Sequence, residues 1–263
     1  MDITDYKNKL RLSALGQNER SANIDRHDCV HLDCNNDGLQ DIACFVGAVR
    51  NTGLGYNELY LTQPDGSLQK VFNHGLQKYP SSSTRKAVVL KHASGSNLIF
   101  VGNNGRKRSD KRTNANRMYR NLLTGKPPYF VELQGPFNKL FDVTCAVAGD
   151  LNADGLDDLI VCENKNLPRI YLQTMTGQFR EVKLPTHNVK QSHLGNWRNV
   201  RIANITNSRL PDIVAVEGEG TDEPAYLHVF GGKVKPPYFR FHRPVYKRRY
   251  VLLCCIPGLS RPR

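Results

Sequence analysis

The chain contains 263 residues, of which 39% are hydrophobic, and carries 37 Lys and Arg against 24 Asp and Glu. This composition supplies enough apolar side chains for one folded domain, and 21 Gly with 14 Pro is typical of a loop-rich all-β protein. The longest apolar run, residues 251–256, falls far short of the roughly 18 residues of a spanning helix. The polar N-terminal segment, residues 1–26, lacks the apolar centre of a secretory signal.

The first motif along the chain is a nine-residue loop at residues 33–41 with the pattern D-x-N-x-D-G-x-x-D. Oxygen ligands at positions 1, 3 and 5 can point at one centre, Gly at position 6 permits a sharp turn, and the carbonyl at position 7 and the final Asp complete a Ca²⁺ shell. The apolar run 42–46 then predicts a buried strand, and Cys44 stands where an EF-hand would require Glu. A strand-loop-strand calcium site is therefore favoured.

The same pattern recurs at residues 150–158, again followed by a strand-like run at 159–162. An acidic turn that binds no ion is the alternative for either loop, because Asn, Asp and Gly are also ordinary turn residues. Two full matches in one chain favour calcium.

A second recurring piece has a central aromatic or His residue, at Tyr60, Tyr119, Tyr171 and His228, with 52 to 59 residues between successive members. A Gly-containing turn and another strand-like stretch follow each one. We therefore predict four units of about four short strands each, at residues 27–75, 84–133, 143–185 and 197–246. Such repetition predicts an all-β fold, a β-propeller with about four blades, as a partial propeller or a small ring. Residues 247–263 are predicted to be a basic, disordered tail.

Two of the units have lost the calcium loop. Residues 204–212 retain one carboxylate and place Arg209 where Gly is needed, and residues 91–97 are too short and carry no carboxylate. The strand-like run 98–101 is nevertheless retained after the second of these segments. We therefore expect calcium to brace a blade corner rather than to act in catalysis.

The segments 149–161, 116–121 and 57–61 make the chain resemble the FG-GAP or VCBS repeat, the blade of integrin α heads. The resemblance is closest to ASPIC/UnbV-type, cartilage acidic protein-like repeats. It spans residues 27–246 and implies an extracellular or cell-surface location. It also implies two calcium shells, formed by Asp33, Asn35, Asp37, Leu39 through its carbonyl and Asp41, and by Asp150, Asn152, Asp154, Leu156 through its carbonyl and Asp158.

The net charge of +13 is unevenly placed, with a basic cluster at Arg106, Lys107, Arg108, Lys111 and Arg112. A solvated loop is the simplest interpretation, and a polyanion-binding surface is the alternative. Acidic glycan, anionic lipid and nucleic acid would all be attracted. Few aromatic residues are interleaved, so recognition of a specific nucleic-acid sequence is disfavoured.

Seven cysteines show no zinc spacing, and their odd number leaves at least one unpaired in a monomer. Cys44, Cys145 and Cys162 lie in apolar runs and are expected to be small buried hydrophobic residues. A bridge between Cys29 and Cys34 is a weaker alternative.

No linear catalytic motif is present in the sequence. We therefore predict a non-catalytic, calcium-binding β-propeller module for interaction or adhesion that binds a protein or acidic glycan, with self-association through open blade edges. The alternatives are a propeller-type enzyme acting on polysaccharide and an incomplete fragment of a larger adhesion protein. Three or more His, Tyr, Arg or carboxylate side chains gathered in one channel pocket would favour the enzyme.

Overall fold

The computed structural model describes residues 26–47, 56–78, 83–104, 115–139, 142–164, 166–184, 197–218, 225–233, 239–242 and 247–248. These residues form four antiparallel sheets, each with four strands that follow one another in the sequence, and the last sheet has a fifth strand beside its third. We call the sheets blades 1 to 4. In this part of the chain, no helix has the length and apolarity needed to cross a membrane.

The blades have the same strand order, and the strand bounds are as follows. Blade 1 contains β1 (Arg26–Leu32), β2 (Asp41–Val46), β3 (Glu58–Thr62) and β4 (Leu68–Val71). Blade 2 contains β5 (Thr84–Lys91), β6 (Asn97–Asn103), β7 (Arg117–Asn121) and β8 (Phe130–Leu133), followed by the 3-10 helix η2 (Pro136–Lys139). Blade 3 contains β9 (Val143–Gly149), β10 (Asp158–Glu163), β11 (Arg169–Gln173) and β12 (Phe179–Val182). Blade 4 contains β13 (Trp197–Ala203), β14 (Asp212–Glu217), β15 (Ala225–Gly232) and β16 (Phe239–His242).

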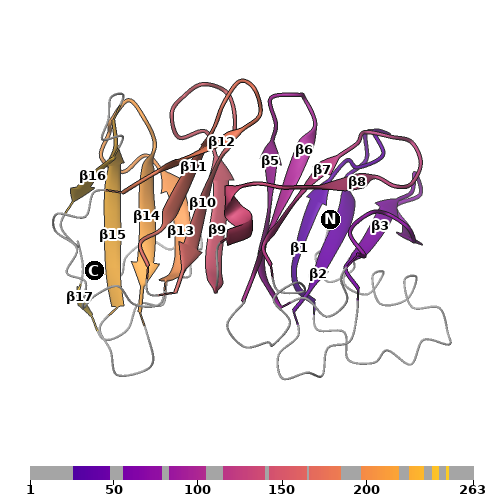
Figure 1. The fold of residues 1–263 in the computed structure, drawn as a ribbon, viewed down its shortest axis with the longest axis horizontal. Helices are drawn as coiled ribbons and strands as arrows, with labels where there is room; N and C mark the ends of the chain where they lie inside the picture. Colours follow the sequence, from indigo (N-terminus) through magenta and orange to yellow (C-terminus); the bar gives the residue numbers. More distant parts are fainter. Residues whose placement is uncertain are drawn as a thin grey trace, which may run out of the picture.

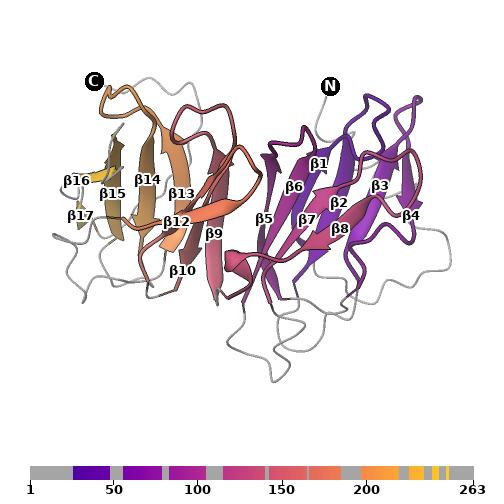
Figure 2. The same cartoon turned by 45° about the horizontal axis from the view of Figure 1, so that its top comes forward.

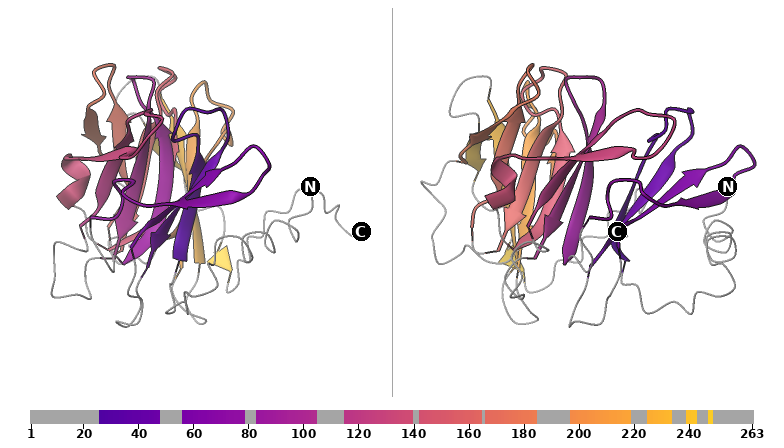
Figure 3. Two further views of the ribbon diagram at one scale, coloured as in Figure 1. Left: turned by 90° about the vertical axis from the view of Figure 1, so that its right-hand side faces the viewer. Right: turned by 45° about the vertical axis from the view of Figure 1, so that its right-hand side comes forward.

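The blades stand side by side in chain order, and blades 1 and 4 lie at opposite ends of the molecule (Figures 1 and 2). The first strand of each blade contacts the first strand of the next blade: β1 contacts β5, β5 contacts β9, and β9 contacts β13. The views in Figure 3 show the sheets fanned about this inner edge. The predicted all-β propeller of four-stranded blades is therefore confirmed, in the form of an open arc.

Three apolar clusters fill the seams between neighbouring blades. The second strand of each blade has an apolar run whose side chains point alternately to the two faces of the sheet. Both faces are buried in blades 2 and 3, so one strand there contributes to the seams on both sides of its blade. In β6, Ile99 and Val101 pack toward blade 1, whereas Leu98 and Phe100 pack toward blade 3. The recurring residues Tyr60, Tyr119, Tyr171 and His228 occupy the third strands and are all buried.

The predicted tail begins differently from the expectation. Lys247 and Arg248 form β17 (Lys247–Arg248), which pairs with Tyr226 and Ala225 of β15. The rest of the segment predicted to be disordered lies outside the described residues.

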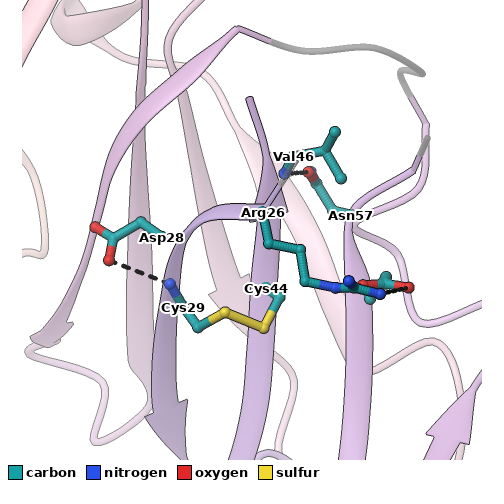
Figure 4. The surroundings of a disulfide bond; sticks show 7 residues. Arg26, Asp28, Cys29, Cys44, Val46 and Asn57 are labelled. Atoms are coloured by element: carbon teal, nitrogen blue, oxygen red, sulfur yellow. Dashed lines mark hydrogen bonds and ion pairs between the residues drawn. A yellow bond between two sulfur atoms is a disulfide. The ribbon is translucent and has the colours of Figure 1, made fainter. Parts of the chain in front are cut away.

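Cys44, Cys145 and Cys162 are buried as expected, but all three form disulfides, and Cys29 does not pair with Cys34. Cys29 lies opposite Cys44 in the β1–β2 register, and Cys145 lies opposite Cys162 in the β9–β10 register. Each pair forms a disulfide, and Figure 4 shows the first of them. Cys34 stays a buried free thiol, whose pKa is raised by burial and by the neighbouring Asp41. Cross-strand pairing depends on register, which the apolar runs alone did not reveal.

Candidate calcium loops and inner-strand pocket

The loop between β1 and β2 gathers its first three predicted ligands around shared backbone N–H groups. Asp37 N donates to Asp33 Oδ1 at 3.1 Å and to Asn35 Oδ1 at 3.2 Å, and Gly38 N donates to Asp33 Oδ2 at 2.8 Å. Leu39 N donates to Asp37 Oδ1 at 2.8 Å. Gly38 has a φ of 87°, a conformation that favours glycine, so the sharp turn requires it.

The loop between β9 and β10 repeats these contacts. Asp154 N donates to Asp150 Oδ1 at 3.2 Å and to Asn152 Oδ1 at 3.1 Å, and Gly155 N donates to Asp150 Oδ2 at 2.8 Å. Leu156 N donates to Asp154 Oδ1 at 2.9 Å, and Gly155 has a φ of 84°. Two separate segments of the sequence therefore fold into the same cradle of oxygens.

The last Asp of each loop also accepts hydrogen bonds from the backbone, a role that the sequence did not reveal. Both carboxylate oxygens of Asp41 accept backbone N–H groups, from Cys34 at 2.9 Å and from Thr62 at 3.0 Å. The fully buried Asp158 accepts in the same way from Leu151 and Gln173, at 2.9 and 2.8 Å. These carboxylates tie the loop to the third strand of the blade. We call them clamp carboxylates.

Blade 4 keeps its clamp carboxylate although its loop has lost the other acids. The buried Asp212 accepts N–H groups from Ile205 at 2.7 Å, Thr206 at 2.6 Å and Gly232 at 3.1 Å. Burial opposes ionisation of Asp212, but the N–H and hydroxyl groups of Thr206 and its neighbours hold its pKa below the usual range. The clamp therefore belongs to the blade, with or without an ion.

The donor set fits a hard cation in its chemistry. Asp, Asn and backbone carbonyl oxygens are the ligands that Ca²⁺ prefers, and an oxygen that accepts one N–H keeps a second lone pair. Within the described ranges, no three His, Cys, Asp or Glu side chains converge. Each loop offers two carboxylates and one amide in its cradle, and its third carboxylate, the clamp, also accepts an N–H group of the third strand.

Both cradles lie at seams between blades. Asn121 Nδ2 of blade 2 donates to Asp33 O of the first loop at 3.1 Å. On the other side of blade 2, Lys91 N donates to Asp157 Oδ2 of the second loop at 2.7 Å. Gln173 Nε2, from the strand clamped by Asp158, donates to Lys91 O at 2.9 Å. Blade 2, which has no cradle of its own, is therefore bonded to both loops.

The predicted anion-binding residues Arg106, Lys107, Arg108, Lys111 and Arg112 lie outside the described residues.

A cavity of about 370 Å³ opens at the starts of the inner strands β5, β9 and β13, the ends opposite the calcium loops. We call it the inner-strand pocket. Its lining residues are Arg85, Asn104, Asp142, Val143, Thr144, Asn164, Trp197 and Arg198. The sequence did not reveal this site because its residues come from three blades and share no linear motif.

One lining residue of the pocket, Asp142, is held in an unusual conformation. Asp142 is buried and has a φ of 57°, in the left-handed region that non-glycine residues seldom adopt. Asn164 Nδ2 donates to Asp142 Oδ2, and Asn164 N donates to Asp142 O, both at 3.2 Å. Such conformations cluster at functional sites, where the surrounding structure holds them in place.

No family model matches the chain, and no curated protein matches it. Among solved structures, the chain is similar to the crystal structure of the GH43_1 enzyme from Xanthomonas citri complexed with xylotriose. The TM-score is 0.41 and the identity is 10%, over 84% of this chain and 74% of that chain.

The predicted non-catalytic interaction or adhesion module requires correction. Arg85, Asp142 and Arg198 line one pocket, and such a convergence of charged side chains from several blades is the arrangement expected of a propeller enzyme rather than of an adhesion module. The prediction of an adhesion module is therefore withdrawn.

Proposed function

We propose that the chain is a calcium-binding propeller in which the two cradles hold Ca²⁺ and brace the blades. The observation that carries this proposal is the identical set of internal hydrogen bonds in the two loops. The bonds from both loops to blade 2 support a bracing role. The proposal includes membership of the FG-GAP or VCBS type of repeat, which these loops resemble.

Electrostatics in the second loop also favours a cation. The pKa of Asp158 is raised to about 7, mainly by burial and also by the charges of Asp154 and Asp150, while the Gln173 and Leu151 N–H groups act in the opposite direction. A divalent ion beside these carboxylates would relieve their repulsion. The proposed role of the ion is therefore to stabilise the loop in its folded form.

Calcium titration calorimetry tests this proposal. We expect two sites in the wild type and one site in each of Asp37→Ala and Asp154→Ala, because each change removes a ligand from one cradle. Asp65→Ala is the matched control, since Asp65 is an exposed turn residue of blade 1 that caps Ser67 N at 2.9 Å. Wild-type stoichiometry in both loop variants would refute the assignment.

The proposal extends to an extracellular or cell-surface location. Disulfides persist in oxidising compartments, and two link neighbouring strands here. Millimolar calcium outside cells would also match the affinity of extracellular modules.

A second candidate function is a propeller-type enzyme acting on polysaccharide at the inner-strand pocket. The convergence of two guanidinium groups and a buried carboxylate favours it. Asp142 is the only carboxylate among the described lining residues and would act as general acid or base. Release of reducing ends from a panel of polysaccharides is expected for the wild type and should fall at least about 100-fold in Asp142→Asn. Equal release by both proteins, or none by the wild type, would reject this function.

A further inference from the structure

The inner-strand pocket contains two arginines that lack a carboxylate partner among the described residues. Arg85 Nη1 contacts the ring nitrogen His27 Nδ1 at 2.6 Å, and Arg198 Nε donates to Gly218 O at 2.8 Å. By contrast, three other arginines bond to glutamates, in the pairs Arg26–Glu58, Arg117–Glu132 and Arg169–Glu163. A guanidinium has five N–H donors, so these single contacts leave most of the fork available.

The described lining residues consequently carry a net positive charge. Among them, two guanidiniums stand against one carboxylate, Asp142, which already accepts from Asn164. An arginine fork binds a carboxylate because two parallel charge-assisted hydrogen bonds form. The cationic side of the pocket therefore selects an anion.

Asn164 requires a hydrogen-bond donor rather than an anion. Its Nδ2 donates to Asp142, which fixes the orientation of the amide, and its buried Oδ1 has no hydrogen-bond partner. A buried acceptor without a donor costs about 1–3 kcal/mol, so a ligand that supplies a hydroxyl would satisfy it. An anion alone would not.

We infer that the inner-strand pocket binds a small hydroxylated carboxylate, whose carboxylate pairs with Arg85 and Arg198 and whose hydroxyl donates to Asn164 Oδ1. The volume of about 370 Å³ lies in the range of small-molecule sites. This inference names a ligand class for the pocket, and it is independent of calcium binding and of whether a reaction follows.

Three six-carbon probes separate the two requirements. D-Gluconate carries both the charge and the hydroxyls, sorbitol carries only the hydroxyls, and hexanoate carries only the charge. Trp197 is the single tryptophan of the chain and lines the pocket, so its indole ¹H–¹⁵N signal reports occupancy directly. We expect gluconate to shift this signal saturably, with an affinity at least about tenfold above that of sorbitol and of hexanoate.

Variants then place the ligand. Arg198→Gln should weaken gluconate binding about tenfold or more, and Arg85→Gln should do the same. Arg201→Gln is the matched control, since Arg201 lies on the same strand and donates to Asn199 Oδ1 and Val200 O outside the pocket lining. Melting curves confirm that each variant is folded, and the exposed Arg198 makes its variant the safer test. Three results would overturn the inference: no saturable gluconate shift, equal affinity for either partial probe, or unchanged affinity in folded Arg198→Gln.

Discussion

Asp41→Ala is expected to lower the free energy of unfolding by about 4 kcal/mol, even in the presence of a calcium chelator. The change removes the acceptor for two backbone N–H groups, those of Cys34 and Thr62, and leaves them without a partner. A buried donor left unsatisfied costs roughly 1–3 kcal/mol. Denaturant unfolding in chelator measures the effect.

Asp37→Ala is the matched comparison in the same loop. Asp37 is exposed and should matter mainly when calcium is bound, so in chelator its loss should be small. Asp212→Ala in blade 4 should resemble Asp41→Ala, because Asp212 clamps a loop that lacks the other carboxylates. If Asp41→Ala and Asp37→Ala are equally stable in chelator, the clamp has no separate role.

Acid should destabilise the fold through His74. This side chain is fully buried, and burial lowers its pKa from about 6.5 to about 4. Between these two values the unfolded chain binds a proton that the folded chain refuses, so stability falls as the pH is lowered. The stability that comes from keeping His74 neutral is fully present above pH 6.5. Lowering the pH from 6.5 to 4 removes roughly 3 kcal/mol of it.

His74→Asn isolates this effect. His74 Nδ1 accepts Leu76 N at 3.2 Å, and an Asn side-chain oxygen can replace that acceptor without titrating in this range. The difference in unfolding free energy between wild type and variant should therefore shift in favour of the variant as the pH falls. His31→Asn, at an exposed histidine, controls for loss of an imidazole. A pH-independent difference would show that the buried ring does not titrate as expected.

Local sequence patterns predicted the blades well because the deciding residues recur within each one. The apolar runs after residues 41 and 158 became the doubly buried strands β2 and β10. The recurring Tyr60, Tyr119 and Tyr171 marked third strands, since each is a large side chain that is buried. The glycines at 38 and 155 marked turns that require positive φ.

Features that depend on register or on several blades could not be read from the sequence. Cys29 and Cys44 are opposite one another only because β1 and β2 pair in one particular register. The loop pattern predicts Asp41 as a calcium ligand, but it could not predict the hydrogen bond from Thr62 N, a residue 21 positions away. Arg85, Asp142 and Arg198 meet only once three blades are assembled.

If the two candidate calcium loops bind ions, their bonds to blade 2 link ion binding to the cooperativity of unfolding. Asn121 and Lys91 lie in the one blade that is flanked by both cradles and contains neither. Loss of an ion from the loop of blade 1 or blade 3 would therefore loosen blade 2, which has no cradle of its own. The rate of amide hydrogen exchange in β5 to β8 would therefore depend on the occupancy of both sites. Two separate ion-binding events would change the same observable, the protection of blade 2.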